Sequence, residues 1–176
     1  MGEKQKAIFL DRDGTINIDS GYVGNVDEFV LLPYVIDALK LLEEQGFLLF
    51  IISNQSGVNR GYYTEIDVGK VHEKMMSLIG AHDIAITDCY YCPHTPQEQC
   101  DCRKPLPKTV FDMATRYNVD LSQSYFIGDK ETDVLTGKNA GTKTIFIMGE
   151  KCSVKTDYRA KHLYDAAQWI GQEHDD

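Results

Sequence analysis

Residues 7–15 read Ala7-Ile8-Phe9-Leu10-Asp11-Arg12-Asp13-Gly14-Thr15, and this stretch decides the expected fold. An uninterrupted apolar run predicts a short strand buried on both faces, as in a parallel sheet. Two aspartates and a glycine follow at once, so the strand should end in a polar turn. Ligands bind at the carboxyl ends of strands in open α/β sheets, so Asp11 and Asp13 are expected to face a crevice. A plain surface turn is the alternative, because Asp, Gly and Thr are common in turns.

Apolar runs alternate with helical patterns along the rest of the chain. Further strands are predicted at 48–52, 85–91, 124–127 and 144–148. Helices are predicted between Pro33 and Gly46, after an N-cap at Thr64, at 108–117 and at 131–140. The helix after Thr64 is expected to carry the apolar residues Ile66, Val71, Met75 and Leu78. The alternation predicts a doubly wound α/β fold with a mostly parallel sheet and helices on both faces.

Length and charge limit the classes of protein that fit. The 176 residues suit one domain, 1–176, and the spacing between the motifs leaves no room for a large cap domain. Lys and Arg number 18 against 27 Asp and Glu, and the net charge of −9 argues against binding nucleic acid or an anionic membrane. No apolar run is long enough for a membrane helix or a signal peptide, so a cytoplasmic protein is expected. The acidic tail 172–176 is expected to be frayed.

Polar groups follow two further predicted strands, and a lysine lies between them in sequence. Ser53 follows the second strand and Asp129 follows the fourth, with Lys104 between them. The ordered set of D-x-D-G-T, Ser, Lys and G-D-x-x-x-D resembles the haloacid dehalogenase-like phosphatase superfamily over most of the chain. A carboxylate can attack phosphorus and form an aspartyl-phosphate. The resemblance implies that Asp11 is this nucleophile and that Asp13 protonates the leaving alcohol and then activates water.

Several carboxylates around a phosphate would repel one another unless a cation were bound. Hard oxygen ligands that share a metal with a phosphate are typical of Mg²⁺ sites. We expect Asp11 and Asp129 to bind Mg²⁺ through their side chains and Asp13 through its backbone carbonyl. Asp133 is expected either to orient the site from outside the metal shell or to be an ordinary acid on the helix surface.

The remaining predicted contacts are to substrate. The polar loop after the second strand can hold phosphate oxygens, and Lys104 can offset charge in the transition state, although a solvated surface lysine is the alternative. Ser53 and Lys104 join Asp11 and Asp13 as the predicted catalytic residues. The predicted substrate-binding residues are Asp19, Ser20, Gly21, Tyr22, Ser53, Asn54, Gln55, Ser56, Arg103, Lys104 and Lys130. A plain turn is the alternative for residues 19–22.

Three cysteines and a histidine lie together within residues 92–102. Cys92, His94, Cys100 and Cys102 supply the sulfur and nitrogen ligands of a tetrahedral structural zinc site, inserted as a loop before Arg103 and Lys104. Chance clustering or redox cysteines are the alternative. Cys89 is expected to face the core from a strand, and Cys152 has no predicted role.

The zinc loop followed by Arg-Lys-Pro narrows the resemblance to two groups of phosphatases. These are the heptose bisphosphate phosphatases of lipopolysaccharide precursor synthesis and the histidinol-phosphate phosphatases, and the phrases around residues 11–23, 53–61 and 90–105 resemble the first more closely. The expected partner is a small sugar phosphate, and the expected state is a monomer. A zinc-stabilised binding module without activity and a phosphatase acting on nucleic-acid ends are the alternatives from other classes.

Overall fold

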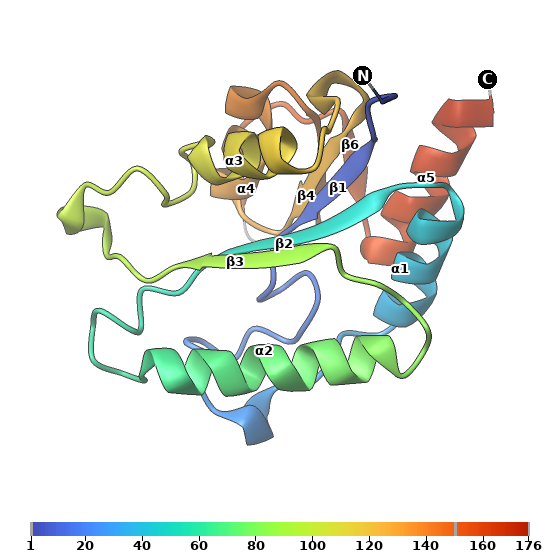
Figure 1. Ribbon diagram of the computed structural model, residues 1–176. Coiled ribbons are helices and arrows are strands. Elements are labelled where there is room, and N and C mark those ends of the chain that lie inside the picture. The colour runs from blue at the N-terminus through green and yellow to red at the C-terminus, as the bar shows by residue number, and fades with distance from the viewer. Residues whose placement is uncertain (1, 150, 176) are drawn as a thin grey trace.

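The computed structural model describes residues 2–149 and 151–175 and is built on one parallel sheet (Figure 1). The strands are β1 (Ala7–Leu10), β2 (Leu48–Asn54), β3 (Asp88–Cys92), β4 (Tyr125–Gly128), β5 (Lys143–Ile147) and β6 (Tyr158–Ala160). Their spatial order is β3-β2-β1-β4-β5-β6, and every neighbouring pair is parallel. The central position of β1 explains why all its residues are buried.

Helices cover both faces of this sheet (Figure 1). They are α1 (Val35–Glu44), α2 (Glu65–Gly80), α3 (Lys108–Arg116), α4 (Glu131–Ala140) and α5 (Leu163–Asp175). Alternate residues of β1 point to opposite faces: Ile8 and Leu10 pack in the cluster that includes residues of α1, α2 and α5, whereas Ala7 and Phe9 pack with residues of α3 and α4. The predicted doubly wound α/β fold is confirmed, and no large cap covers the sheet in the part of the chain that the structure describes.

Two details of the predicted elements are wrong. Residues 85–87, predicted as the start of a strand, precede β3, which runs from Asp88 to Cys92. In α2, Ile66 is 72% exposed and Leu78 is 36% exposed, while the buried residues are Val68, Val71, Met75 and Ile79. These four are spaced three or four residues apart and form one face of a helix; Ile66 points away from this face, and Leu78 lies at its edge.

The C-terminal region contains a strand and a helix that the sequence analysis does not predict. β6 extends the sheet beside β5, and α5 packs against α1. The expectation of a frayed tail is wrong for residues 172–175, since α5 continues through Asp175, and Asp176 lies outside the described residues. Burial of Leu163, Ala166 and Ile170 anchors this helix. None of the helices in the described ranges is long and apolar enough to cross a membrane.

Candidate active site

The predicted motif residues meet at one edge of the sheet. Asp11 directly follows β1, Asp129 directly follows β4, and Ser53 lies near the end of β2. Because β1 pairs with both β2 and β4, the carboxyl ends of these strands are neighbours. The backbone N–H of Asp11 still donates to the carbonyl of Ile127, at 3.1 Å, so its position is set by the sheet itself.

Three buried carboxylates form a cluster at this edge. Asp11, Asp129 and Asp133 each offer an oxygen within 4.8 Å of the others. Burial, together with the nearby Asp11 and Asp133 charges, raises the pKa of Asp129 to about 8. Oδ1 of Asp129 is buried and has no hydrogen-bond partner among the described residues. A cation would offset this repulsion and satisfy the unpaired oxygen, so the donor set fits a hard divalent metal such as Mg²⁺.

Gly14 allows the turn after β1 to approach Asp129. Its φ is +85°, and a Cβ on this residue would lie 2.0 Å from Oδ2 of Asp129. Any larger residue would therefore clash with the carboxylate and be strained in its backbone. The glycine of the D-x-D-G-T motif is explained by this close approach.

Lys104 contacts two carboxylates of this cluster. It follows residues 92–102, the Cys/His loop, in sequence. Its Nζ donates to Oδ1 of Asp11 at 2.7 Å, to Oδ1 of Asp133 at 2.6 Å and to the carbonyl of Ile52 at 2.9 Å. Burial opposes its charge, but the two carboxylates outweigh burial and raise the pKa of Lys104. The side chain of Asn54 accepts from the N–H of Lys104 and donates to its carbonyl. The alternative of a solvated surface lysine is therefore wrong.

Asp133 holds two basic residues in place. Only 1% of it is exposed, so the alternative of a helix-surface acid is wrong. Its Oδ1 accepts from Lys104, and its Oδ2 accepts the backbone N–H of Lys130 at 3.0 Å. Burial, followed by the Asp11 charge, raises the pKa of Asp133 to about 6.

The carboxylate of Asp13 lies outside the three-carboxylate cluster and is surrounded by donors. Arg12 donates to both of its oxygens, at 2.9 and 3.1 Å, and Asn17 donates to Oδ1 at 2.9 Å. Gln55 donates to Oδ2 at 2.8 Å. Arg12 is completely buried and is also tied to the carbonyl of Val23. The sequence analysis missed Arg12 and Asn17, because neither residue type identifies itself as a partner of Asp13 without the fold.

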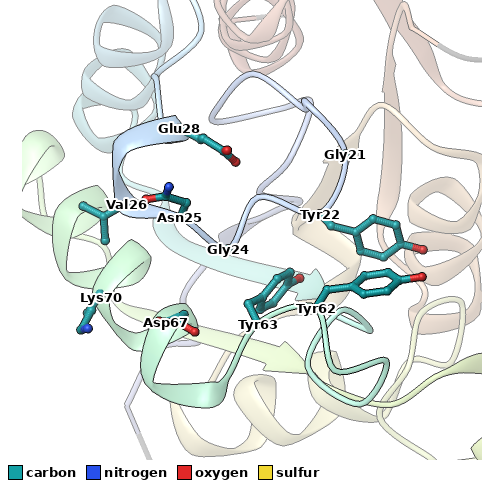
Figure 2. A pocket seen from close by; sticks show the side chains of 10 residues that line it. All are labelled: Gly21, Tyr22, Gly24, Asn25, Val26, Glu28, Tyr62, Tyr63, Asp67 and Lys70. Carbon is teal, nitrogen blue, oxygen red and sulfur yellow. The ribbon is translucent and has the colours of Figure 1, made fainter.

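The predicted substrate residues are only partly brought together. Lys130 donates to Oδ2 of Asp19 at 3.1 Å, which joins two of them at the loop 19–22. Arg103 donates to the carbonyl of His94 at 3.0 Å and so lies against the Cys/His loop. Both amide hydrogens of the Gln55 side chain are used inside the protein, by Asp13 and by Ser53. Loop 19–22 also borders a cavity of about 660 Å³, whose wall includes Tyr22, Tyr62 and Tyr63 (Figure 2).

The Cys/His loop gathers its four predicted ligands. Sγ of Cys92 lies 3.0 Å from Sγ of Cys102 and 3.6 Å from Sγ of Cys100, and the two sulfurs of Cys100 and Cys102 are 3.7 Å apart. Nδ1 of His94 lies 3.4 Å from Cys92 and 3.3 Å from Cys102. A zinc tetrahedron with ordinary bond lengths has edges of about 3.5–3.8 Å. The cluster is therefore close to the size that a zinc ion requires.

The other two cysteines stand apart from this cluster. Cys89 lies in β3 and packs against the core, as predicted, with its sulfur 3.7 Å from Nδ1 of His72. Cys152 contacts the carbonyl of Val154. All five cysteines of the chain are free thiols in the structure.

Comparisons with known proteins agree with this geometry. Residues 101–167 match the HAD-hydrolase-like family. The D-glycero-beta-D-manno-heptose-1,7-bisphosphate 7-phosphatase of Helicobacter pylori (strain J99) is 39% identical, and the match covers 94% of this chain and 97% of that protein. The protein of the same name from Escherichia coli (strain K12) is 37% identical, with coverage of 97% and 90%.

A solved structure shares the whole architecture. The D,D-heptose 1,7-bisphosphate phosphatase from B. bronchiseptica, complexed with magnesium and phosphate, superimposes with a TM-score of 0.86 and 30% identity. The match covers 96% of this chain and 99% of that one. This chain therefore belongs to the haloacid dehalogenase-like hydrolases, in the family of the heptose-1,7-bisphosphate 7-phosphatases.

Proposed function

We propose that this chain is a Mg²⁺-dependent phosphatase that removes the 7-phosphate of D-glycero-D-manno-heptose 1,7-bisphosphate during the synthesis of lipopolysaccharide heptose precursors. The observation that carries the proposal is the arrangement of two aspartates with different surroundings at the end of β1. Asp11 contacts Lys104 beside the unpaired oxygen of Asp129, whereas Asp13 is held apart by neutral amides and Arg12. The names of the two relatives and of the solved structure supply the sugar substrate.

The two aspartates have different proposed roles, Asp11 as the nucleophile and Asp13 as the general acid and base. A carboxylate oxygen of Asp11 forms a bond to phosphorus as the bond from phosphorus to the sugar oxygen breaks. Asp13 gives its proton to the departing sugar oxygen. Water then attacks the phosphorus of the aspartyl-phosphate while Asp13 accepts a proton from it. Inorganic phosphate leaves, and both carboxyl groups return to their starting states.

Positive charge is needed where the substrate phosphate approaches Asp11 and Asp129, because the phosphate and the carboxylates repel one another. Lys104 is positioned to offset charge on Asp11 and on the phosphate oxygens in the transition state, since its ammonium already contacts Asp11. Asp11 and Asp129 would hold Mg²⁺ through their side chains, and Asp13 through its carbonyl. When bound, Mg²⁺ supplies positive charge that reduces the repulsion between the substrate phosphate and these carboxylates.

Substrate recognition is proposed to divide between two rims of the site. Residues 19–22 and Lys130 form one rim, where the contact between Lys130 and Asp19 supports a shared role. Arg103, carried by the Cys/His loop, forms the other, and its planar guanidinium suits phosphate oxygens. Ser53 and Ser56 remain candidates for phosphate contacts. Asn54 and Gln55 are proposed to act by holding Lys104 and Asp13, because their side-chain amides are engaged there.

We propose that Cys92, His94, Cys100 and Cys102 bind a structural Zn²⁺. All four positions of a tetrahedron are filled by protein ligands, so no position is open for substrate. The ion would organise a loop that packs few apolar residues and would set the path of the chain into Arg103 and Lys104.

The proposed enzyme works on a small molecule, as a monomer in the cytoplasm. Free thiols at all five cysteines are consistent with a reducing compartment. The net charge of −9 gives no support for a nucleic-acid partner.

The test compares initial rates of phosphate release with Mg²⁺ present. Both anomers of the heptose 1,7-bisphosphate and histidinol phosphate serve as substrates, and we expect a strong preference for the beta anomer that the relatives' names specify. A preference for histidinol phosphate would overturn the substrate assignment. Release of phosphate from no sugar phosphate would favour a binding module instead.

A further inference from the structure

We propose that Tyr63 is a positioning residue for this reaction, acting through the side-chain amide of Gln55 to hold the carboxylate of Asp13 for proton transfer. The inference rests on the proposed role of Asp13 and extends it to a tyrosine outside the predicted site residues. The three side chains form a chain of hydrogen bonds. The hydroxyl of Tyr63 donates to Oε1 of Gln55 at 2.6 Å, and Nε2 of Gln55 donates to Oδ2 of Asp13 at 2.8 Å.

The hydroxyl of Tyr63 anchors the amide of Gln55 at its oxygen, while Asp13 contacts the amide nitrogen. A glutamine amide has similar shape in its two flipped orientations, but only one presents its hydrogens to Asp13. Oε1 has no hydrogen, so in the observed orientation the hydroxyl of Tyr63 must be the donor. Both hydrogens of Nε2 then face the site, one toward Asp13 and the other toward Ser53 Oγ at 3.2 Å. Without the hydroxyl, Oε1 of Gln55 would lose this partner, and the amide that donates to Asp13 would be held less firmly.

The ring of Tyr63 is tightly enclosed by its neighbours, which fixes the position of its hydroxyl. A Cβ on Gly24 would lie 2.2 Å from the ring, and a Cβ on Gly57 would lie 2.3 Å from it. The ring therefore occupies a slot that exists only because both neighbours are glycines. The next residue, Thr64, is the N-cap of α2 and forms a capping box with Asp67, which fixes the backbone beside the tyrosine.

The adjacent tyrosine provides a natural contrast. Tyr62 is 62% exposed and packs edge to face on Tyr22, with ring centroids 4.8 Å apart (Figure 2). Its hydroxyl has no hydrogen-bond partner among the residues that the structure describes. Burial raises the pKa of Tyr63 to about 12, so its hydroxyl remains a donor at neutral pH. Position, burial and partners separate two tyrosines that are neighbours in sequence.

The experiment uses the dependence on the leaving group. The purified full chain with Mg²⁺ is assayed for kcat/KM on heptose 1,7-bisphosphate, whose alkoxide must be protonated, and on p-nitrophenyl phosphate, whose phenolate departs without a proton. For Tyr63→Phe we expect a loss of about tenfold on the sugar and at most about twofold on the aryl ester, because an imprecisely held acid loses part of its contribution. Tyr62→Phe removes a hydroxyl from the same loop and should change neither value.

A second variant tests whether Tyr63 acts through Gln55. Gln55→Met removes the amide at nearly constant length, and Tyr63→Phe should cause no further loss in that background. Equal losses on the two esters, an unchanged sugar rate, or additive losses in the double variant would each overturn the inference while leaving the proposed function standing. A wild-type protein that hydrolyses neither ester would overturn both.

Discussion

The carboxylate site and the Cys/His loop both gather groups that can bind a metal, but they are built in opposite ways. Asp11 and Asp129 are far apart in the chain and are neighbours because β1 pairs with β4. The proposed Cys/His ligands all lie within residues 92–102: Cys92 ends β3, and the regular structure described between the others is one short 3-10 helix, Pro96–Glu98. In the first region the sheet holds the ligands, whereas in the second the sheet holds only Cys92 and the proposed ion would join the other three ligands to it.

This difference implies different roles for the two proposed metal ions. A cation at the carboxylate site would change the charge of a framework that hydrogen bonds and buried strands already fix. A cation in the Cys/His loop would supply the framework. The two regions meet at Lys104, which follows the loop in sequence and contacts Asp11 in space. Losing the first metal should stop the chemistry, and losing the second should loosen the structure first.

The largest expected effect comes from the nucleophile. Asp11→Asn should lower phosphate release by about 10⁴-fold or more, since the amide cannot form the aspartyl-phosphate. Stability should change little, because one repelling charge is removed from the cluster along with one partner of Lys104. Steady-state rates and thermal unfolding measure both, and Asp112→Asn, at an exposed acid, is the matched control. Activity near the wild-type level would move the nucleophile elsewhere.

The second effect should appear in stability before activity. Cys100→Ser removes one of the four proposed zinc ligands, so bound zinc should fall and the unfolding temperature should drop by about 5–10 °C, the shift expected for a loss of a few kcal/mol in a domain of this size. Elemental analysis and thermal unfolding test this. Cys152→Ser, outside the cluster, should alter neither. Unchanged zinc content in Cys100→Ser would exclude the proposed ligand set.

The smallest expected effect is a pH dependence confined to the carboxylate site. The pKa of Asp129 is raised in the folded protein to about 8, so the folded state binds more protons than the unfolded state below that pH. Without Mg²⁺, stability should therefore fall as the pH rises toward 8. Added Mg²⁺ binds the ionised carboxylates, so its stabilising shift, a few degrees in unfolding temperature, should grow over the same range.

Asp129→Asn provides the control for this linkage. The variant keeps the shape of the side chain and lacks its titration, so both the fall in stability and the pH-dependent part of the Mg²⁺ shift should shrink. A Mg²⁺ shift that is the same at low and high pH in the wild-type protein would contradict the proposed site. Thermal unfolding at a series of pH values is sufficient for the measurement.

Short sequence patterns predicted the features that are formed within a single strand or loop. The apolar run before Asp11 predicted a buried strand, and the spacing of the Cys/His residues predicted a compact cluster. The burial of Val68 rather than Ile66 in α2 was not predicted, because both are good candidates for burial until the packing partner is known. β6 and α5 were missed because their anchoring contacts are with β5 and α1, distant in sequence.

The fold class, the aspartates at the end of β1 and the four proposed ligands of the Cys/His loop could be predicted from the amino-acid sequence alone. These follow from residue type and short spacing, which act within one element or one turn. The burial of Asp133 against Lys104, and the donors Arg12, Asn17 and Gln55 around Asp13, became visible only in the folded chain. The physical reason is that a buried polar group needs a partner, and the partner is chosen by which strands and loops are neighbours in space.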